Sequence, residues 1–496
     1  MHKLEEQDLS IFIHSLSKKA ANAFLRHLKS SSQKGALDQY RLFKIISKNG
    51  NFSKELFLNK HPITNKKYSQ LKFDLFQELL AYNKRNYAPY SDADLYNQLV
   101  DFELLLDKGL YIKAIRKFKT IKIIALEKCN FSVYCIAQKK VIEHRLFRKM
   151  SPQRTLEKES NDLKHYRSLS DNLDYYTILS DEVLNLHYEF MDKRVNNREN
   201  ILKFLEHPLL KDISNARCVM AKYYYYRIKS LIYRGDNNYE ESGRLSLKAL
   251  NYLESNTSKY RDDYLQQVIC INNYLDASLH ILDTGDFEAM YARMVNFTKK
   301  ISKKNHLDSN ARAFQFLCTL KMNYFWITRD TVSFSKEFRD FKLNFEKYYF
   351  ILRPNFRLEI ILGFAKMHFL LGDLEKAEAF CRRLEEEKTN PTALYIICLN
   401  LLRIMVNFDM GNYSMIPHLV NTSKYVLKKW DRLFDLERLF LNDIHKVKSY
   451  HSDCEKTAIF VNLYEKISIL LDTPRDMIID NKIRLLEWLR IKANLT

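Results

Sequence analysis

The segment GDLEKAEAFCRRL, residues 372–384, carries the pattern that decides the fold. Gly372 allows the chain to turn tightly after one helix, and Asp373 can cap the next helix. Behind them, apolar and small residues recur at steps of three, four and three on one stripe of a helix: Leu374, Ala377, Cys381 and Leu384. The small residue in this stripe lets a neighbouring helix approach closely. Because the pattern recurs along the chain, the sequence predicts a helical repeat protein.

Four further copies combine a turn glycine with apolar and small residues at similar spacing. They contain Gly109, Tyr111, Ala114, Phe118 and Ile121; Tyr239, Ser242, Ser246 and Ala249 behind Gly235; Gly285, Phe287, Met290, Met294 and Phe297; and Gly411, Tyr413, Ile416, Val420 and Ser423. Weaker copies occur near Phe334 and Thr457. From residue 239 onward, successive copies start 39 to 48 residues apart.

The stretch between residues 130 and 230 contains no copy that can be indexed with this pattern. Its length allows two further helix pairs. Breaks between helices are expected near Pro152, at Asn196–Asn197 and at Pro208.

Two of the copies, GLYIKAIRKF and GDLEKAEAF, resemble the second helix of a tetratricopeptide repeat. Ala365 and Ser278, each seven residues before a turn glycine, match the small residue of the first helix in that family. The resemblance covers about residues 95–470 and implies a right-handed α-solenoid of helix hairpins that binds a peptide or protein on its concave face. The period here is longer than the family's 34 residues, and the terminal proline is mostly missing. The chain also resembles bacterial proteins of this general kind, which implies no function.

Composition supports an all-α chain with several parts. Only 9 Gly and 8 Pro occur in 496 residues, too few for the strand ends of a sandwich, barrel or Rossmann sheet. The polar stretch at residues 83–94, which contains Pro89, is the best domain boundary. We therefore expect a helical domain at residues 1–90, a repeat array at 91–472 and a C-terminal capping helix at 473–496.

The first 90 residues predict a small bundle of helices. One helix follows Ser17, a second covers residues 37–47 and buries Leu37, a short one follows Ser53, and a longer one follows Thr64. A short helix, a turn and a long helix also outline a helix-turn-helix, with Lys66, Lys67 and Lys72 available for phosphate. A packed N-terminal domain is the leading interpretation, and nucleic-acid binding is the alternative.

The net charge of +20 indicates either a cationic soluble surface or an anionic partner. The eight cysteines are spread singly without a CxxC motif, which favours buried free thiols in a reducing compartment. The first ten residues are acidic where a signal peptide is basic, and the most apolar stretch, residues 395–406, is too short to span a bilayer. We expect a cytoplasmic protein without a transmembrane segment.

The strongest local charge lies between Tyr111 and Met150, where eleven Lys and Arg face two Glu. The cations fall outside the apolar stripe of the predicted helices. They include Lys113, Arg116, Lys117, Lys139, Lys140, Arg145 and Arg148. This pattern indicates either a solvated helix face or a binding surface for an acidic segment or a phosphate backbone.

Four consecutive tyrosines, Tyr223–Tyr226, form another unusual stretch. Four adjacent residues point all round a helix, so at least one should be exposed or lie in a groove. Packing is the leading interpretation, and a stacking platform for a peptide or base, formed by Tyr223, Tyr224 and Tyr226, is the alternative.

No catalytic pattern is present: the sequence lacks HExxH, GxSxG, a P-loop and GxGxxG. The 14 histidines are scattered, and we expect neither a metal nor a cofactor. The sequence therefore predicts a non-enzymatic scaffold that binds a protein or peptide partner, acidic if it meets the basic run. The alternative is a nucleic-acid-associated regulator that uses the N-terminal helices or the basic face at residues 111–150.

Overall fold

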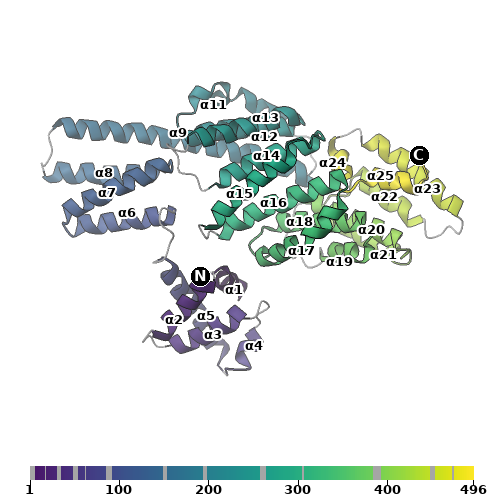
Figure 1. The fold of residues 1–496 in the computed structure, drawn as a ribbon, viewed down its shortest axis with the longest axis horizontal. Coiled ribbons are helices and arrows are strands. Elements are labelled where there is room, and N and C mark those ends of the chain that lie inside the picture. Colours follow the sequence, from purple (N-terminus) through teal and green to yellow (C-terminus); the bar gives the residue numbers. More distant parts are fainter. Residues whose placement is uncertain are drawn as a thin grey trace. The chain divides into compact units, whose positions relative to one another are not determined.

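The computed structural model describes residues 6–16, 18–30, 35–48, 54–61, 63–84, 92–148, 153–193, 198–256, 264–303, 307–383, 393–429, 431–446, 453–471 and 474–495. Over these ranges the chain is helical and contains no strand, which confirms the predicted all-α class (Figure 1). It divides into two compact units, one formed by residues 1–166 with 301–310 and one formed by the remainder.

The first unit begins with five helices around their own hydrophobic core: α1 (Glu6–Ser15), α2 (Lys18–Ser30), α3 (Ala36–Lys48), α4 (Lys54–Leu58) and α5 (Asn65–Lys84). The last four confirm the helices expected from the sequence, and α1 was not foreseen. The Thr64 hydroxyl accepts a hydrogen bond from the Lys67 amide at 3.3 Å, as a cap of α5 should. The expected caps Ser17 and Ser53 and the turn at residues 49–50 lie outside the described residues.

Two expectations for these helices are wrong. Leu37 is 62% exposed, although the stripe of α3 should have buried it, because it lies off the stripe formed by Leu42, Phe43 and Ile46. Lys72 is buried in α5, so it cannot meet a phosphate backbone at the surface. Lys66 and Lys67 are exposed.

The same unit contains a second core, built by α6 (Asp92–Asp107), α7 (Tyr111–Glu127), α8 (Phe131–Arg148) and the beginning of α9 (Gln153–Lys193). Helices α6 and α7 form the predicted hairpin, with Ala114 and Phe118 buried at the contact. The ring of Tyr166 on α9 packs edge-on against Tyr134 of α8 at 4.6 Å.

The expectation of two helix pairs between residues 130 and 230 is wrong. The chain forms α8 and then α9, a single helix of 41 residues. The short helices α10 (Arg198–Lys203), η1 (Phe204–Glu206), α11 (Pro208–Lys211) and η2 (Ile213–Asn215) follow. Pro152 and Asn196–Asn197, where two breaks are expected, lie outside the described residues. Pro208 occupies the first turn of α11, where its missing N–H costs nothing.

The second unit is organised around five consecutive hairpins (Figure 1). Their first helices are α12 (Val219–Gly235), α14 (Leu265–His280), α16 (Leu307–Thr328), α18 (Pro354–Leu370) and α20 (Ala393–Asp409). Their second helices are α13 (Tyr239–Ser255), α15 (Phe287–Lys303), α17 (Thr331–Tyr348), α19 (Leu374–Arg382) and α21 (Ile416–Lys429). The second helices start 42 to 48 residues apart, a longer period than that of a tetratricopeptide repeat.

One turn geometry joins the two helices of each hairpin. A residue with positive φ follows the first helix, and the next amide donates to the carbonyl five residues back, for example from Asp373 to His368 at 3.0 Å. Asp373 then caps α19 by accepting from the Lys376 amide. Equivalent turns have Gly109, Asn237, Leu282, Arg329 and Gly411 at the left-handed position.

Three predicted repeat positions differ from this geometry. Gly235 is the last residue of α12, and the left-handed residue of its turn is Asn237. Gly285 lies later in its turn, where Leu282 takes the left-handed conformation. Tyr413 precedes α21 and is 39% exposed, and its ring packs edge-on against Phe408 of α20 at 5.2 Å. Gly235 instead permits close packing, since a Cβ there would lie 2.9 Å from Ile201.

The C-terminal region contains α22 (Asp435–Ile444), α23 (Asp453–Leu470), α24 (Pro474–Ile483) and α25 (Leu485–Lys492). The single capping helix expected at residues 473–496 is therefore two helices, separated at Arg484, which has φ +52°. Trp488 on α25 is buried edge-on against Phe408 of α20 and Phe460 of α23. These contacts make α25 part of the core.

We predict that Gly372→Ala destabilises the second unit by about 1 to 2 kcal/mol, because φ is +74° at this residue and an L side chain is strained there. The matched control is Gly285→Ala, where φ is not positive and a Cβ meets only the Asp283 carboxylate at 3.4 Å. Urea unfolding followed by circular dichroism measures both. Equal destabilisation by the two substitutions would contradict the assigned turn geometry.

We also predict an acid-sensitive core around His368, which lies among Phe334, Phe338 and Phe380 with neither ring nitrogen hydrogen-bonded. Burial lowers the pKa of His368 to about 4. Below pH about 6.5, His368 binds a proton in the unfolded chain but stays neutral in the folded chain until the pH reaches about 4. The free energy of unfolding therefore decreases as the pH falls from about 6.5 to 4.

His368→Phe should therefore flatten the dependence of stability on pH in this window, by on the order of 2 to 3 kcal/mol at pH 4, and leave stability at pH 7 nearly unchanged. The exposed His418→Asn serves as control. Urea midpoints at several pH values provide the measurement, and an unchanged slope in His368→Phe would refute the assignment.

Candidate partner-binding face

The first helices of the five hairpins lie next to one another and form a surface that we call the A-helix face, made by α12, α14, α16, α18 and α20. Arg234 of α12 reaches Asp276 of α14, and Lys366 of α18 reaches Asn323 of α16. Helices α18 and α20 pack directly. The first helices are buried over most of their length, α18 and α20 above all, so the polar side chains that they carry are few and recessed.

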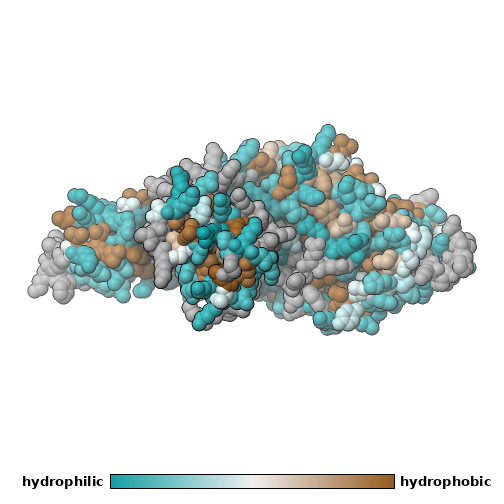
Figure 2. All heavy atoms as spheres, turned by 90° about the horizontal axis from the view of Figure 1, so that it is seen from below, coloured by the Kyte–Doolittle hydropathy of each residue, from teal (hydrophilic) through white to brown (hydrophobic). Residues whose placement is uncertain are grey.

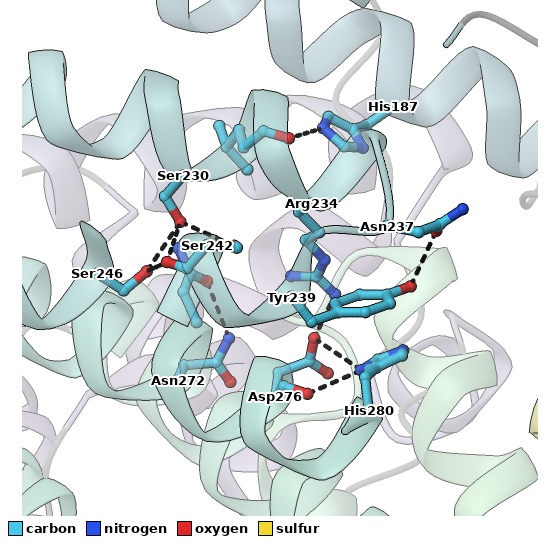
Figure 3. A network of polar contacts seen from close by, with 12 residues as sticks. His187, Ser230, Arg234, Asn237, Tyr239, Ser242, Ser246, Asn272, Asp276 and His280 are labelled. Carbon is cyan, nitrogen blue, oxygen red and sulfur yellow. Dashed lines mark hydrogen bonds and ion pairs between the residues drawn. The ribbon is translucent and has the colours of Figure 1, made fainter. Parts of the chain in front are cut away.

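An ion pair between Arg234 and Asp276 lies at one end of the A-helix face (Figure 3). The guanidinium nitrogen and the carboxylate oxygen are 2.5 Å apart, and the two side chains are 35% and 15% exposed. Burial opposes ionisation of Asp276, but Arg234, and next His280, hold its pKa below the ordinary value. Asp276 in turn raises the pKa of Arg234. The pair is therefore charged, recessed and still reachable from solvent.

Aromatic rings border this pair. Tyr239, the first residue of α13, stacks on His280 with ring centroids 4.3 Å apart, and the His280 Nδ1 lies 2.7 Å from the Asp276 carbonyl (Figure 3). Behind them, Ser230 of α12 hydrogen-bonds to the Ser242 and Ser246 hydroxyls of α13 at 3.1 and 2.9 Å. These buried contacts fix α12 against α13 and so fix the direction of Arg234.

A second group of polar side chains lies on α18 and α20. Tyr395 of α20 lies near the Glu359 carboxylate of α18, and burial, followed by the charge of Glu359, raises the pKa of Tyr395. Burial raises the pKa of Glu359, with Lys482 of α24 opposing this effect and Asp276 adding to it. Glu359 thus responds to charges from α14 and α24, which places these groups within electrostatic range of one another.

Lys366 is the most deeply buried charge of the face. Its Nζ donates to the Asn323 side-chain oxygen at 3.0 Å and lies 5.2 Å from the centre of the Trp326 ring. Burial, and secondarily the charge of Lys482, lower its pKa to about 7. Near neutral pH this ammonium group therefore exchanges between its charged and neutral forms.

Helices α24 and α25 cover part of the A-helix face. Arg484 lies over the Trp326 ring at 5.1 Å and donates to the Ile327 carbonyl, and Glu487 pairs with Arg329. Trp488 Nε1 lies 3.2 Å from both carboxylate oxygens of Asp409. The segment from α16 to α20 is thus partly occupied by the chain's own C-terminal helices, and Arg234 and Asp276 remain accessible beside it.

The basic run selected from the sequence lies elsewhere, on α7 and α8 of the first unit. Lys117 pairs with Asp101 at 3.0 Å, Arg145 with Glu159 at 2.9 Å, and Lys139 with Glu143 at 3.7 Å. Four exposed cations have no ion-pair partner among the described residues: Lys113, Arg116, Lys119 and Lys140. The side chain of Arg148 lies outside the described residues. The run is therefore a partly neutralised surface with a small set of free cations.

The tyrosine run forms part of α12. Tyr223 and Tyr225 are buried, and Tyr224 and Tyr226 are half-buried. Lys229 lies over the Tyr225 ring at 5.1 Å, and Arg227 lies over Tyr224 at 5.8 Å. Most of the ring surface is thus used by packing.

A cavity of about 300 Å³ opens between α6 and α8, lined by Glu103, Leu106, Asp107, Lys140, Glu143 and His144. Within the described parts of the chain, this cavity included, no group of three His, Cys, Asp or Glu residues could hold a metal ion. None of the described helices has the length and apolar character needed to cross a membrane. Comparison of the chain with protein-family models, with curated proteins and with solved structures gave no match.

Sequence reasoning missed the residues of the A-helix face. The signal that could have found them is a charge within an otherwise apolar helix: Lys366 interrupts IILGFAKMHFLL, residues 360–371, and Asp276 lies in the middle of NNYLDASLH, residues 272–280. Because such a charge faces burial on most sides, it needs a partner or a function. The partners lie 40 or more residues away, which no local pattern reveals.

Proposed function

We propose that this chain is a non-enzymatic scaffold that binds a peptide or protein segment on its A-helix face. The observation that carries the proposal is a set of charged groups of both signs within electrostatic range of one another: Arg234 of α12, Asp276 of α14, Glu359 of α18 and, from α24, Lys482. The hairpins would then form a solenoid of the tetratricopeptide-like kind, with this face on its inner side.

Charges in recessed positions cost free energy of desolvation. A buried or half-buried ion pair contributes little to stability, because desolvation offsets the attraction between its members. Apolar side chains at the same positions would pack as well. Recessed charges do, however, make strong hydrogen bonds to a partner and select it by complementarity. Their retention on one face therefore favours recognition as their role.

The arrangement selects the chemistry of the partner. Arg234 is 35% exposed and has guanidinium donors beyond those facing Asp276, so it can bind a carboxylate. Glu359 and Asp276 can accept from a lysine or arginine. We therefore propose a linear segment with acidic and basic side chains, bound in the reducing environment of the cytoplasm, where the seven described free cysteines are stable.

We predict that exchanging the ion pair, Arg234→Asp with Asp276→Arg, abolishes recognition while keeping the fold. Random peptides of about twelve residues, displayed on phage and selected on the full chain, provide the probe, with affinities measured by fluorescence anisotropy. Selected peptides should lose at least about tenfold in affinity for the exchanged variant, because the pair persists with its polarity reversed.

The matched control exchanges an exposed pair on a second helix, Arg244→Glu with Glu241→Arg on α13. This variant should bind the selected peptides like the parent chain, and thermal unfolding should show both variants folded. Equal binding by parent and Arg234/Asp276 variant, or the absence of any selected peptide, would refute the proposal.

A second candidate function is association with nucleic acid, favoured by the exposed cations on α7 and α8. If these cations contact phosphate, binding to random DNA or RNA must weaken steeply with salt. We predict that Lys139→Glu with Lys140→Glu removes such binding and that Lys428→Glu with Lys429→Glu, an exposed lysine pair on α21, does not. Absence of binding in low salt would eliminate this candidate.

A further inference from the structure

Helix α6 carries an apolar stripe that nothing in the described structure covers. Tyr96, Val100 and Leu104 recur at steps of four, so they lie on one face, and each is more than half exposed. The opposite face, with Leu95, Leu99 and Phe102, packs in the core. Viewed from below in Figure 2, apolar side chains gather at the left end of the molecule, where α6 lies in Figure 1. Terminal helices of repeat arrays normally present a polar outer face, so this stripe indicates an interface.

The border of the stripe is acidic. Helix α6 contains five Asp or Glu and no Lys or Arg. Glu103 and Asp107 lie along one side of the stripe, where they also line the cavity of about 300 Å³ together with Glu143. Asp101 lies on the other side. The occupant that fits is therefore a helix face with apolar side chains among cations.

The chain itself presents such a face on α7. Ile112, Arg116, Lys119 and Ile123 recur at steps of four, three and four and are all exposed, with Lys113 beside them. The two isoleucines are about 16 Å apart along the axis, and the α6 stripe is about 12 Å long, so their lengths are similar.

We propose that the α6 face of one molecule binds the α7 face of a second copy. Because the two faces differ, the contact is heterologous: in a pair, one copy still has a free α7 face and the other a free α6 face, so association continues into chains or closed rings. Two helix faces form a small interface, for which a dissociation constant of about 10 µM is expected. The attraction between acidic and basic borders weakens as salt is added.

Sedimentation velocity of the full chain over a range of concentrations tests this proposal. Val100→Glu places a carboxylate among the acids of α6 and should weaken association at least about tenfold. Arg116→Glu with Lys119→Glu should do the same from the α7 side. The matched control is Ile178→Glu on α9, since Ile178 and Val100 are both 55% exposed.

Mixing the two defective variants gives the decisive result. Each retains the face that the other has lost, so an equimolar mixture must form one-to-one dimers and stop there. Association that is equal in all variants, or a mixture that stays monomeric, would overturn the proposal. So would a parent chain that stays monomeric over the whole concentration range.

Discussion

The hydrogen bond from the amide after each left-handed residue to the carbonyl five residues back is the constraint on which the hairpins depend. It ends the first helix, reverses the chain and delivers the next residue to the position of a helix cap, as at Asp330 and Asp373. A side-chain oxygen of that residue then accepts from the new helix. Because the reversal takes so few residues, the two helices must pack against each other, as α12 does with α13 and α18 with α19.

This constraint explains how much of the fold the sequence predicts. A glycine at the left-handed position can be recognised in the sequence, so the hairpins at Gly109 and Gly372 can be predicted from the repeat pattern. Leu282, Arg329 and Cys129 adopt the same conformation without glycine, because the packed helices on both sides enforce it. No local signal marks these turns, and Gly285 draws attention to the wrong residue. The 41 residues of α9 were equally hidden, since a polar helix without repeats offers no periodicity to index.

The candidate site could not be predicted, for a different reason. Its charges acquire their properties from neighbours distant in sequence: Lys366 from Asn323 and Trp326, and Glu359 from Lys482 on the C-terminal helix α24. The basic run and the tyrosine run, by contrast, attract attention because they are dense. A run of similar residues in the sequence shows only the local composition. A binding site requires side chains that lie close together in space, and here the packing of neighbouring helices brings distant residues together.

Lys366 and Lys321 are both buried lysines, but they differ in the groups that surround their charge. Lys321 of α16 pairs with Glu288 of α15 at 2.7 Å. Its ammonium group also lies within 6 Å of four aromatic ring centres, so the carboxylate and the rings together compensate its charge; the rings belong to Phe287, Tyr291, Tyr324 and Phe325. Burial lowers the pKa of Lys366, which has a neutral amide and one ring as neighbours and the like charge of Lys482 nearby. Both lysines lie in the aromatic-rich core, but Lys321 has a carboxylate partner, whereas Lys366, which is 3% exposed, has only a neutral amide as its hydrogen-bond partner. Compensation of the charge by a carboxylate therefore decides how costly it is to bury a lysine in this core.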